Sequence, residues 1–544
     1  MSQDNKQLQK YDIIKELGHG GMGRVYQAKD TVDDKIVAIK KLTSRLVVSP
    51  KAVLLMRNEF RTMTQLSHPN AVQVYDYGID EDVPYYVMEY IEGQDLNDVD
   101  NPSVEQIVDV LIQLCQVLSY FHSRNLVHRD LKPGNVKVLA DGSIKVIDYG
   151  LMTQLGVPAS GRITGTCEYL APEAISGGII DERTDLYALG ILAYEMLTGK
   201  LPFTGTRLEV LRSQLKTMPA PPRSIKAAIP ETLSDIVMKL LAKDPEERYR
   251  DGASVIEDMA HLTTRERSVE TTTQQQSYLY SSRMIGRDEE LALGTKLLED
   301  GKGALLVGAP GGVGKTRYML TIRTQALIEN WRSVKVDVHG TAHFLYGWVR
   351  QLYRQLEGLS SDELTKKHGE VFSKLGKCAD GEVTGALVSW IRELGKEGKL
   401  VVFSDDMQWA DGKSLQIFNE LVRQLNKEPI IFVTAFRNNE VGPTSPLWQT
   451  TEEGVSQYLE LGPLTKQQTG DLMEHLLFPS KPSDDFLEQS FKASGGNAFD
   501  LIEFLRYLVA TGNLTRSGRK WEEPVSLSTL DLPAEQSERV IARI

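Results

Sequence analysis

Cysteine and long apolar runs are both scarce in this chain. Only three of its 544 residues are cysteine, Cys115, Cys167 and Cys378, and their spacing suits neither a disulfide framework nor a metal-binding cluster. No run approaches the ~20 apolar residues that a membrane-spanning helix needs, and residues 1–10 lack the apolar core of a signal peptide. We therefore expect a protein of the reducing cytoplasm with no membrane partner.

An excess of basic side chains is also missing. The chain has 62 lysines and arginines against 74 aspartates and glutamates, which gives a formal net charge of −12. This balance disfavours general binding to nucleic acid or to anionic membranes, so we predict no nucleic-acid partner. The length exceeds what one hydrophobic core can organise and suits two large domains.

The first half does contain a run of residues that suits phosphoryl transfer. It extends from His128 to Asn135 and is followed by Asp148. Catalysis of this reaction rests on positioning and on charge stabilisation. We expect Asp130 to accept the proton of the incoming hydroxyl and Lys132 to lie beside the γ-phosphate. Asn135 and Asp148 are expected to hold Mg²⁺, so the run predicts an ATP- and Mg²⁺-dependent site.

The upstream residues complete this site. Gly18, Gly20 and Gly23 form a G-x-G-x-x-G pattern, in which glycine lets the backbone approach phosphates closely. This pattern alone is a weak signal. A predicted strand would carry Lys40 to the α- and β-phosphates, and Glu59 on a predicted helix is its expected partner. The predicted nucleotide-contacting residues, with a hinge for adenine at the last two, are Leu17, Gly18, His19, Gly20, Gly21, Met22, Gly23, Arg24, Val25, Ala38, Lys40, Met88 and Glu89.

On these motifs, residues 11–262 resemble the catalytic domain of bacterial eukaryotic-like (Hanks-type) serine/threonine protein kinases. The segment 20–26 is particularly similar to bacterial members of that family. The resemblance implies a two-lobed α+β fold. It also implies that Thr166 bridges Asp130 and Lys132 when the substrate pocket is formed.

The resemblance extends to residues that support the site. It implies that Asp185 steadies the catalytic loop and that Arg248 is the buried partner of Glu173. Tyr149 departs from the family by replacing a phenylalanine, which adds a hydroxyl group that needs a partner. A pseudokinase normally lacks one of the catalytic lysine, aspartates or asparagine. All are present here, so we predict an active kinase.

The segment before Thr166 contains the predicted sites of regulatory phosphorylation. Thr164 is favoured and Ser160 is the alternative. A phosphate on either residue could pair with Arg129 of the catalytic loop and order the segment. Thr166 itself is expected to stay unmodified, because its hydroxyl group is needed beside Asp130.

The second half contains a different phosphate-binding pattern. Residues 309–316 form a P-loop with alanine at the first glycine position. Backbone amides would cradle phosphates, Lys315 would reach the β- and γ-oxygens, and Thr316 would bind Mg²⁺. A predicted strand ends at Asp405 and Asp406, of which the first would assist the metal and the second could polarise a water. The alternative is a glycine-rich turn and an unrelated strand.

From residue 284 onward the chain resembles the STAND ATPases (signal-transduction ATPases with numerous domains), a branch of the AAA-like P-loop proteins. Segments 285–289, 405–411 and 495–497 and the P-loop support this. The resemblance implies a nucleotide-sensing role for Arg437 and binding of ATP or ADP with Mg²⁺. Slow hydrolysis and switch-like binding both stay open. The predicted nucleotide-binding and metal residues are Gly311, Gly312, Val313, Gly314, Lys315, Thr316, Asp405, Asp406 and Arg437.

These motifs predict a multidomain protein: a two-lobed α+β protein kinase fold followed by an α/β P-loop NTPase domain with a helical C-terminal part. A tail, 1–10, precedes the kinase domain, 11–262, and a flexible linker, 263–283, joins it to the ATPase domain, 284–460. Residues 461–544 are expected to form a helical lid and the start of a winged-helix-like segment. Because the chain stops within that segment, we expect a fragment or a shortened form of a longer signalling protein.

The sequence thus predicts phosphorylation of serine or threonine on proteins, including this chain itself. The ATPase module would regulate or assemble the protein, with self-association as one route, and the two modules acting independently is the simpler alternative. Two other functions stay open. One is a nucleotide-switched signalling scaffold whose kinase-like half mainly recruits partners, and the other makes the ATPase half the principal enzyme. The protein substrates are not identified by the sequence.

Overall fold

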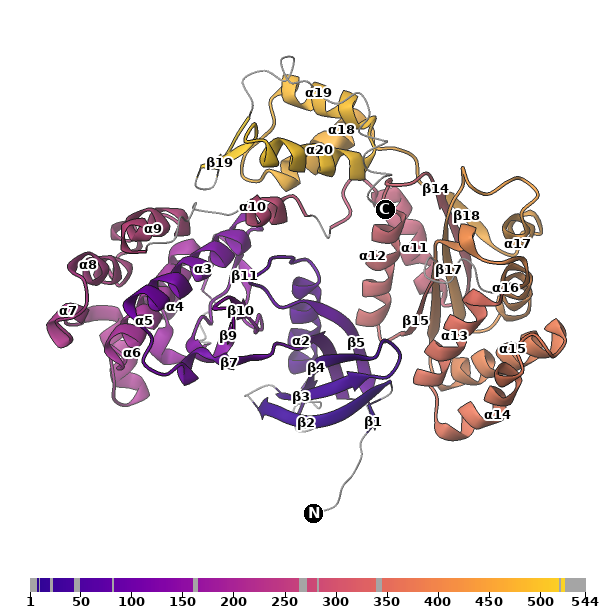
Figure 1. Ribbon diagram of the computed structural model, residues 1–544, viewed down its shortest axis with the longest axis horizontal. Coiled ribbons are helices and arrows are strands. Elements are labelled where there is room, and N and C mark those ends of the chain that lie inside the picture. Colours follow the sequence, from indigo (N-terminus) through magenta and orange to yellow (C-terminus); the bar gives the residue numbers. More distant parts are fainter. Residues whose placement is uncertain are drawn as a thin grey trace.

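Figure 1 shows the computed structural model, in which a two-lobed first half, an α/β domain and a helical lid segment adjoin one another. The predicted site residues Gly20, Gly21, Met22, Ser160 and Thr164 lie outside the described part of the chain. The structure describes residues 7–8, 10–19, 23–43, 49–80, 83–159, 165–263, 272–280, 283–338, 345–517 and 520–523.

The amino-terminal lobe is a twisted antiparallel sheet with one long helix, α2 (Pro50–Met63), against it. Side chains alternate across each strand, so Val37 and Ile39 bury themselves on one face while Ala38 faces the α2 side. Ser49 caps α2 by accepting a hydrogen bond from the amide of Ala52. In sheet order the strands are β1 (Gln7–Leu8), β2 (Tyr11–His19), β3 (Gly23–Asp30), β4 (Lys35–Leu42), β6 (Val83–Glu89) and β5 (Val74–Asp80).

The carboxyl-terminal lobe is built around helix α3 (Val104–Ser123). A capping box between Ser103 and Gln106 starts this helix. Among the described residues, α3 is the one helix whose length and composition would suit a membrane crossing, yet most of it is buried inside the lobe. The other helices are α4 (Pro172–Ser176), α5 (Glu182–Thr198), α6 (Arg207–Lys216), α7 (Pro222–Ile225), α8 (Glu231–Leu240) and α9 (Gly252–Met259). Short strands are β7 (Gly93–Asp95), β8 (Leu126–Val127), β9 (Val136–Leu139), β10 (Ile144–Val146), β11 (Thr153–Gln154), β12 (Val157–Pro158) and β13 (Ile179–Ile180).

A buried ion pair joins distant parts of this lobe. The guanidinium of Arg248 donates two hydrogen bonds to the carboxylate of Glu173, at 2.8 and 2.9 Å. Two backbone carbonyls, those of Ala242 and Arg183, accept further hydrogen bonds from Arg248 at 2.7 and 3.0 Å. This arrangement places Arg248 where the sequence predicted a partner for Glu173.

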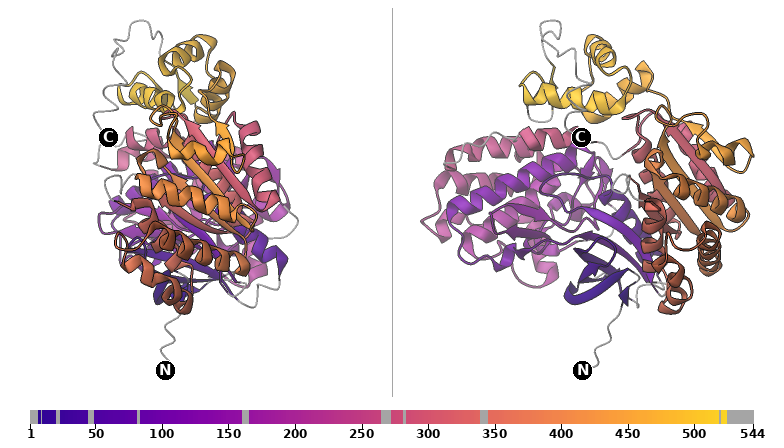
Figure 2. Two further views of the ribbon diagram at one scale, coloured as in Figure 1. Left: turned by 90° about the vertical axis from the view of Figure 1, so that its right-hand side faces the viewer. Right: turned by 45° about the vertical axis from the view of Figure 1, so that its right-hand side comes forward.

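The α/β domain has a five-stranded parallel sheet between two layers of helices, which is visible in both views of Figure 2. Leu305 and Val307 face α11 and α12, whereas Ala304 and Leu306 face the helices of the opposite layer. In sheet order the strands are β15 (Arg332–Asp337), β16 (Leu400–Asp405), β17 (Ile430–Arg437), β14 (Gly303–Ala309) and β18 (Gln457–Glu460). The helices are α11 (Asp288–Asp300), α12 (Lys315–Ile328), α13 (Gly347–Gly358), α14 (Asp362–Ser373), α15 (Asp380–Glu397), α16 (Gly412–Leu425) and α17 (Gln449–Glu452).

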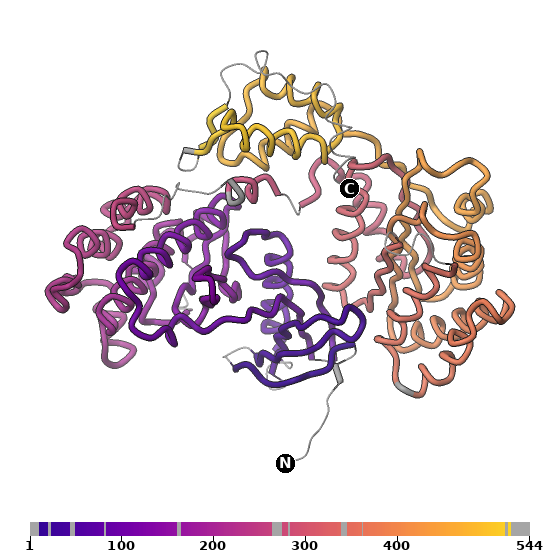
Figure 3. The backbone as a smooth tube through the Cα atoms, viewed as in Figure 1, coloured from indigo at the N-terminus to yellow at the C-terminus, as the bar shows by residue number. Residues whose placement is uncertain are grey.

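The lid segment contains α18 (Lys466–Leu476), α19 (Asp484–Ser494), α20 (Ala498–Ala510), β19 (Thr515–Ser517) and β20 (Lys520–Glu522). Figure 3 shows it above α10 (Thr272–Tyr278), a short helix in the segment expected to be a flexible linker. Tyr278 and Leu279 are buried here. The expectation of flexibility is therefore wrong for residues 272–280, because aromatic and aliphatic packing orders them. The predicted multidomain class, two lobes followed by an α/β domain with helices after it, is confirmed.

Candidate functional site

The catalytic loop, residues 128–135, follows β8, and Asp185 fixes its backbone. One oxygen of this buried carboxylate accepts a hydrogen bond from the backbone amide of His128 at 2.8 Å. The other oxygen accepts one from the backbone amide of Arg129 at 2.8 Å. Nε2 of His122 lies 2.8 Å from Asp185 as well. Burial raises the pKa of Asp185, but hydrogen bonding and charge at His122 outweigh burial and hold it below the usual value. Arg129 has a φ of 68°, a left-handed conformation that the bonds to Asp185 hold in place.

The Asp130 carboxylate of this loop is surrounded by three other predicted residues, Lys132, Asn135 and Thr166. Nζ of Lys132 lies 2.9 Å from Oδ2 of Asp130 and donates to Oγ1 of Thr166 at 2.9 Å. The hydroxyl of Thr166 donates to Oδ1 of Asp130 at 3.2 Å. Nδ2 of Asn135 donates to Oδ2 of Asp130 at 3.2 Å. Thr166 therefore lies between Asp130 and Lys132, and one carboxylate is held within reach of an incoming hydroxyl group.

The facing lobe contributes a lysine between two carboxylates. Nζ of Lys40 on β4 lies 2.7 Å from Oε1 of Glu59 on α2 and 3.2 Å from Oδ1 of Asp148. Burial alone would lower the pKa of Lys40, but Tyr86, Glu59 and Asp148 raise it well above its usual value. Lys40 is therefore held as an ammonium ion between the carboxylates of Glu59 and Asp148.

Asp148 fits the predicted role of a metal ligand. Burial raises its pKa, but Lys40 and hydrogen bonds from its neighbours lower it to about 2, so the carboxylate is ionised at neutral pH. Hard oxygen anions of this kind are what Mg²⁺ prefers. Asn135 donates from Nδ2 to the backbone carbonyl and the carboxylate of Asp130, and its Oδ1 atom would be the second metal ligand.

The described part of the glycine-rich segment forms the hairpin of β2 and β3. Gly18 pairs with Val25 and His19 pairs with Arg24, so these predicted residues lie where β2 ends and β3 begins. Leu17 is exposed nearby, and Gly23 begins β3. On the neighbouring strands Ala38 and Met88 are paired and buried, and the Glu89 side chain is held by Lys145 at 2.9 Å.

The sequence assigned no role to Tyr86 and named no particular partner for the hydroxyl group of Tyr149. The hydroxyl of Tyr86 donates to Oε1 of Glu59 at 2.8 Å, the same oxygen that contacts Lys40. Tyr86 precedes Met88 by two positions on β6, so it shares the face of that strand. The hydroxyl of Tyr149 donates to the carbonyl of Val146 at 3.1 Å, which satisfies the extra polar group at this position.

The predicted second nucleotide site lies where β14 leads into α12. Nζ of Lys315 donates to the carbonyls of Ala309 and Pro310 at 3.0 and 2.9 Å. The hydroxyl of Thr316 donates to Oδ2 of Asp405 at 2.9 Å. Burial raises the pKa of Asp405, and Thr316 opposes this effect. A hydroxyl group and a carboxylate that converge in this way fit the predicted Mg²⁺ site.

A glutamine links the other predicted residues of this site. Gln408 donates a hydrogen bond from Nε2 to Oδ1 of Asp406 at 2.8 Å. Its Oε1 atom accepts a hydrogen bond from the backbone amide of Arg437 at 3.0 Å. The Arg437 guanidinium lies 2.9 Å from Glu440. The positions of Asp406 and Arg437 are thus connected through Gln408, to which the sequence assigned no role.

The lid segment reaches the P-loop through Asn497. Its Nδ2 donates to the carbonyl of Gly311 at 2.9 Å. The amide of Phe499 donates to the carbonyl of Gly312 at 3.1 Å. Gly312 has a φ of 79°, and a Cβ atom there would lie 2.5 Å from the Asn497 side chain. The P-loop and the lid are therefore in direct contact, a contact that the sequence analysis did not predict.

Comparisons with known proteins agree with this geometry. The protein kinase domain model matches residues 11–261, and the AAA ATPase domain model matches residues 283–433. Serine/threonine-protein kinase PknB of Mycobacterium leprae is 35% identical over 266 residues, which are 46% of this chain and 43% of that protein. Serine/threonine-protein kinase PrkC of Bacillus subtilis is 32% identical over 293 residues, which are 52% of this chain and 45% of that protein.

The chain thus spans less than half the length of these relatives. The similarity lies in the first half, where both lobes and the catalytic loop are found. The chain contains a protein kinase domain, residues 11–261, followed by an AAA ATPase domain, residues 283–433.

Proposed function

We propose that this protein transfers the γ-phosphate of ATP to serine or threonine hydroxyl groups of proteins, including its own, in the cytoplasm. The observation that carries the proposal is the presence of two clusters of predicted catalytic residues in the same domain. One is the Asp130 carboxylate with Lys132, Thr166 and Asn135, and the other is Lys40 between two carboxylates. The relatives named as serine/threonine kinases support the choice of acceptor.

The chain's own residues divide the work of phosphoryl transfer. Asp130 would accept the proton of the acceptor hydroxyl, because Lys132 and Thr166 hold its carboxylate in place. Lys40 would contact the α- and β-phosphates, with Glu59 fixing its position. Mg²⁺ held by Asn135 and Asp148 would neutralise phosphate charge. Thr164 and Ser160 stay predicted sites of self-phosphorylation.

The ATPase domain has a role of its own in the proposal. Lys315, Thr316 and Asp405 would bind ATP or ADP with Mg²⁺, and the hydrogen bond between Thr316 and Asp405 supports this. The lid contacts the P-loop through Asn497. We propose that nucleotide binding there regulates the kinase or assembles the protein. The rival function is a nucleotide-switched scaffold whose kinase-like half mainly recruits partners. It is less well supported, because Lys40 and Asp130 make the contacts with their predicted partners that phosphoryl transfer would need.

The Asp130→Asn variant tests the kinase function directly. Transfer of phosphate to the chain itself and to a basic protein should fall to background, because asparagine cannot accept the hydroxyl proton. ATP binding should change little. The measurement is incorporation of labelled phosphate by the full chain with ATP and Mg²⁺, and phosphorylation at the wild-type rate would contradict the assignment. The matched control is Asp141→Asn, an exposed aspartate in the nearby β9–β10 turn.

Tyr86 is a positioning residue in this proposal. It is fully buried, and its hydroxyl group and Lys40 share Oε1 of Glu59. Its ring also lies below the lysine, with Nζ 5.7 Å from the ring centroid. Two hydrogen bonds to one oxygen fix the carboxylate more tightly than one, so the hydroxyl group helps to hold Lys40 for the phosphates.

The Tyr86→Phe variant removes only this hydroxyl group. We expect the KM for ATP to rise and kcat/KM to fall by about 10-fold, the effect of one lost hydrogen bond to a charged group. Steady-state kinetics at varied ATP are the measurement. Tyr85→Phe is the control, since Tyr85 is buried on the opposite face of the same strand. Equal kinetics for both variants would remove Tyr86 from the positioning role.

The Lys315→Ala variant tests regulation through assembly. If nucleotide in the P-loop promotes self-association, the rate of autophosphorylation per molecule should rise with protein concentration in the wild type. That rise should disappear in Lys315→Ala, because the P-loop charge is lost while the kinase site is untouched. The control is Lys302→Ala, an exposed lysine in the turn before β14. Superimposable curves for all three proteins would contradict nucleotide-driven assembly.

A further inference from the structure

Helix α12 joins the second nucleotide site to the kinase domain. Its first two residues, Lys315 and Thr316, belong to the P-loop, and its far end contacts α2 and β5 of the amino-terminal lobe. Figure 1 shows α12 between the sheet of the ATPase domain and that lobe. Its 14 residues span about 21 Å at 1.5 Å per residue. One rigid helix therefore extends from the P-loop of the ATPase domain to the amino-terminal lobe of the kinase domain.

The polar part of this interface is centred on a partly buried ion pair. Nη2 of Arg323 on α12 lies 2.7 Å from Oδ1 of Asp76 on β5, and 14% and 17% of the two side chains are exposed. The hydroxyl of Tyr11 donates to Oδ2 of Asp76 at 3.3 Å, and Lys10 lies 3.6 Å from that oxygen. Burial raises the pKa of Asp76, but Arg323 and Lys10 lower it below the usual value. The carboxylate is thus ionised where Arg323 meets it.

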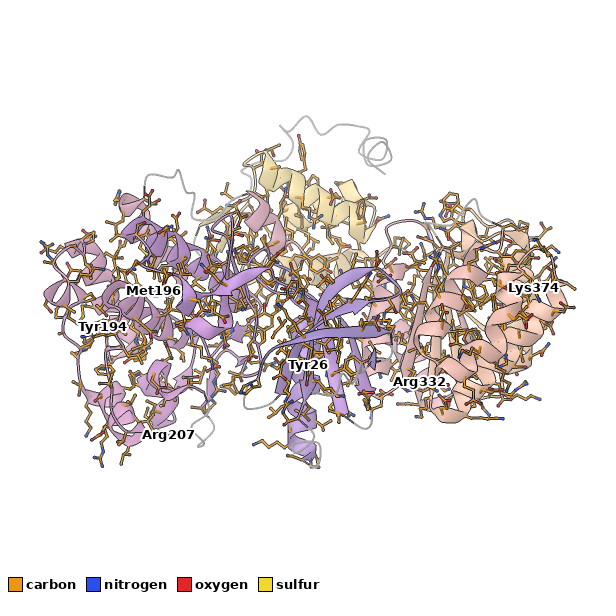
Figure 4. All side chains as sticks on the ribbon, turned by 60° about the horizontal axis from the view of Figure 1, so that its bottom comes forward. Tyr26, Tyr194, Met196, Arg207, Arg332 and Lys374 are labelled. Carbon is orange, nitrogen blue, oxygen red and sulfur yellow. The ribbon has the colours of Figure 1, made fainter. Side chains whose placement is uncertain are left out.

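The end of α12 also reaches the helix that carries Glu59. Oδ1 of Asn330 accepts a hydrogen bond from Nη2 of Arg57 at 2.7 Å. Arg57 precedes Glu59 by two residues on α2. Leu327 is buried in the hydrophobic cluster that contains Phe60 of the same helix. Polar and apolar contacts thus bind α12 to α2. Figure 4 shows Arg332, just beyond α12, at the edge of the ATPase domain beside this lobe.

A second contact ties the start of α12 to the other lobe. The guanidinium of Arg317 lies over the ring of Tyr280, 4.9 Å from its centroid. Arg124, at the end of α3, donates to the carbonyls of Tyr278 and Tyr280 at 2.7 and 2.5 Å. The ring of Tyr278 packs edge-on against Tyr120 of α3 at 5.5 Å. Both ends of α12 are therefore connected to the kinase domain.

We propose that the ATPase domain is an internal docking partner of the kinase domain, in which α12 holds α2 where Glu59 pairs with Lys40. The Lys40–Glu59 pair is formed in the docked arrangement, so docking favours the position of α2 that catalysis needs. A contact made in only one position of α2 shifts the population towards that position. This inference rests on the proposed kinase function.

The test uses the full chain with Arg323→Glu, which places two carboxylates against each other at the interface. Hydrogen exchange in residues 74–80 and 50–63 should become faster, and kcat/KM for phosphorylation of a basic protein should fall by about 5- to 150-fold, the usual range for coupling between sites. Asn330→Ala should change both quantities in the same direction. Arg423→Glu is the matched control, because Arg423 pairs with Glu453 at 2.7 Å within the ATPase domain.

The possible outcomes separate the docking contact, its supporting role and the proposed kinase function from one another. Unchanged exchange in both interface variants would overturn the docking contact. Faster exchange with undiminished phosphorylation would overturn the supporting role of docking. If the wild type transfers no phosphate, the proposed kinase function fails, while the exchange measurement still reports on docking.

Discussion

The buried ion pair between Lys40 and Glu59 links helix α2 to strand β4 and thereby sets the geometry of the proposed kinase site. Lys40 lies on strand β4 and Glu59 on helix α2, which are separate elements of the amino-terminal lobe. Only 13% of the Lys40 side chain and 1% of the Glu59 side chain are exposed. Breaking a buried pair by removing one partner costs about 3–5 kcal/mol because the other charge is left uncompensated. The pair therefore fixes α2 against the sheet and orients the lysine. Tyr86, on the same face of β6 as Met88, strengthens this arrangement by donating a hydrogen bond to Glu59.

The other lobe is organised around a second carboxylate. Asp185 holds the backbone of the catalytic loop, and that loop presents Asp130 with its partners Lys132 and Thr166. Catalysis needs both assemblies at once, so the orientation of α2 relative to this loop is the variable that regulation can act on. The ATPase domain contacts α2 from outside through α12, and its lid contacts the P-loop at which α12 begins. The nucleotide sites are thereby parts of one connected structure.

The fold class could be predicted from local motifs and the family resemblances that they support, and most of the candidate site residues lie in those motifs. Asp130, Lys132 and Asn135 stand in one short run, and Lys315 and Thr316 stand in another, so local spacing was enough to predict roles for them. Tyr86, Gln408 and Arg323 act through partners that are distant in sequence, and no local pattern marks them. The polar run before Tyr278 suggested a flexible linker, but Tyr278 and Leu279 provide the packing that orders the segment. Such tertiary pairings become visible only once the elements are placed in space.

The most direct measurement of the central claim is the steady-state kinetics of phosphate transfer by the full chain with Glu59→Gln. This change keeps the size of the side chain and removes the charge that holds Lys40. We expect kcat/KM for ATP to fall by about 100-fold, comparable to the loss of one preorganised polar group in an active site, while nucleotide binding by the ATPase domain stays unchanged. Phosphate transfer at the wild-type rate would contradict the account, because the Lys40–Glu59 pair would then be dispensable.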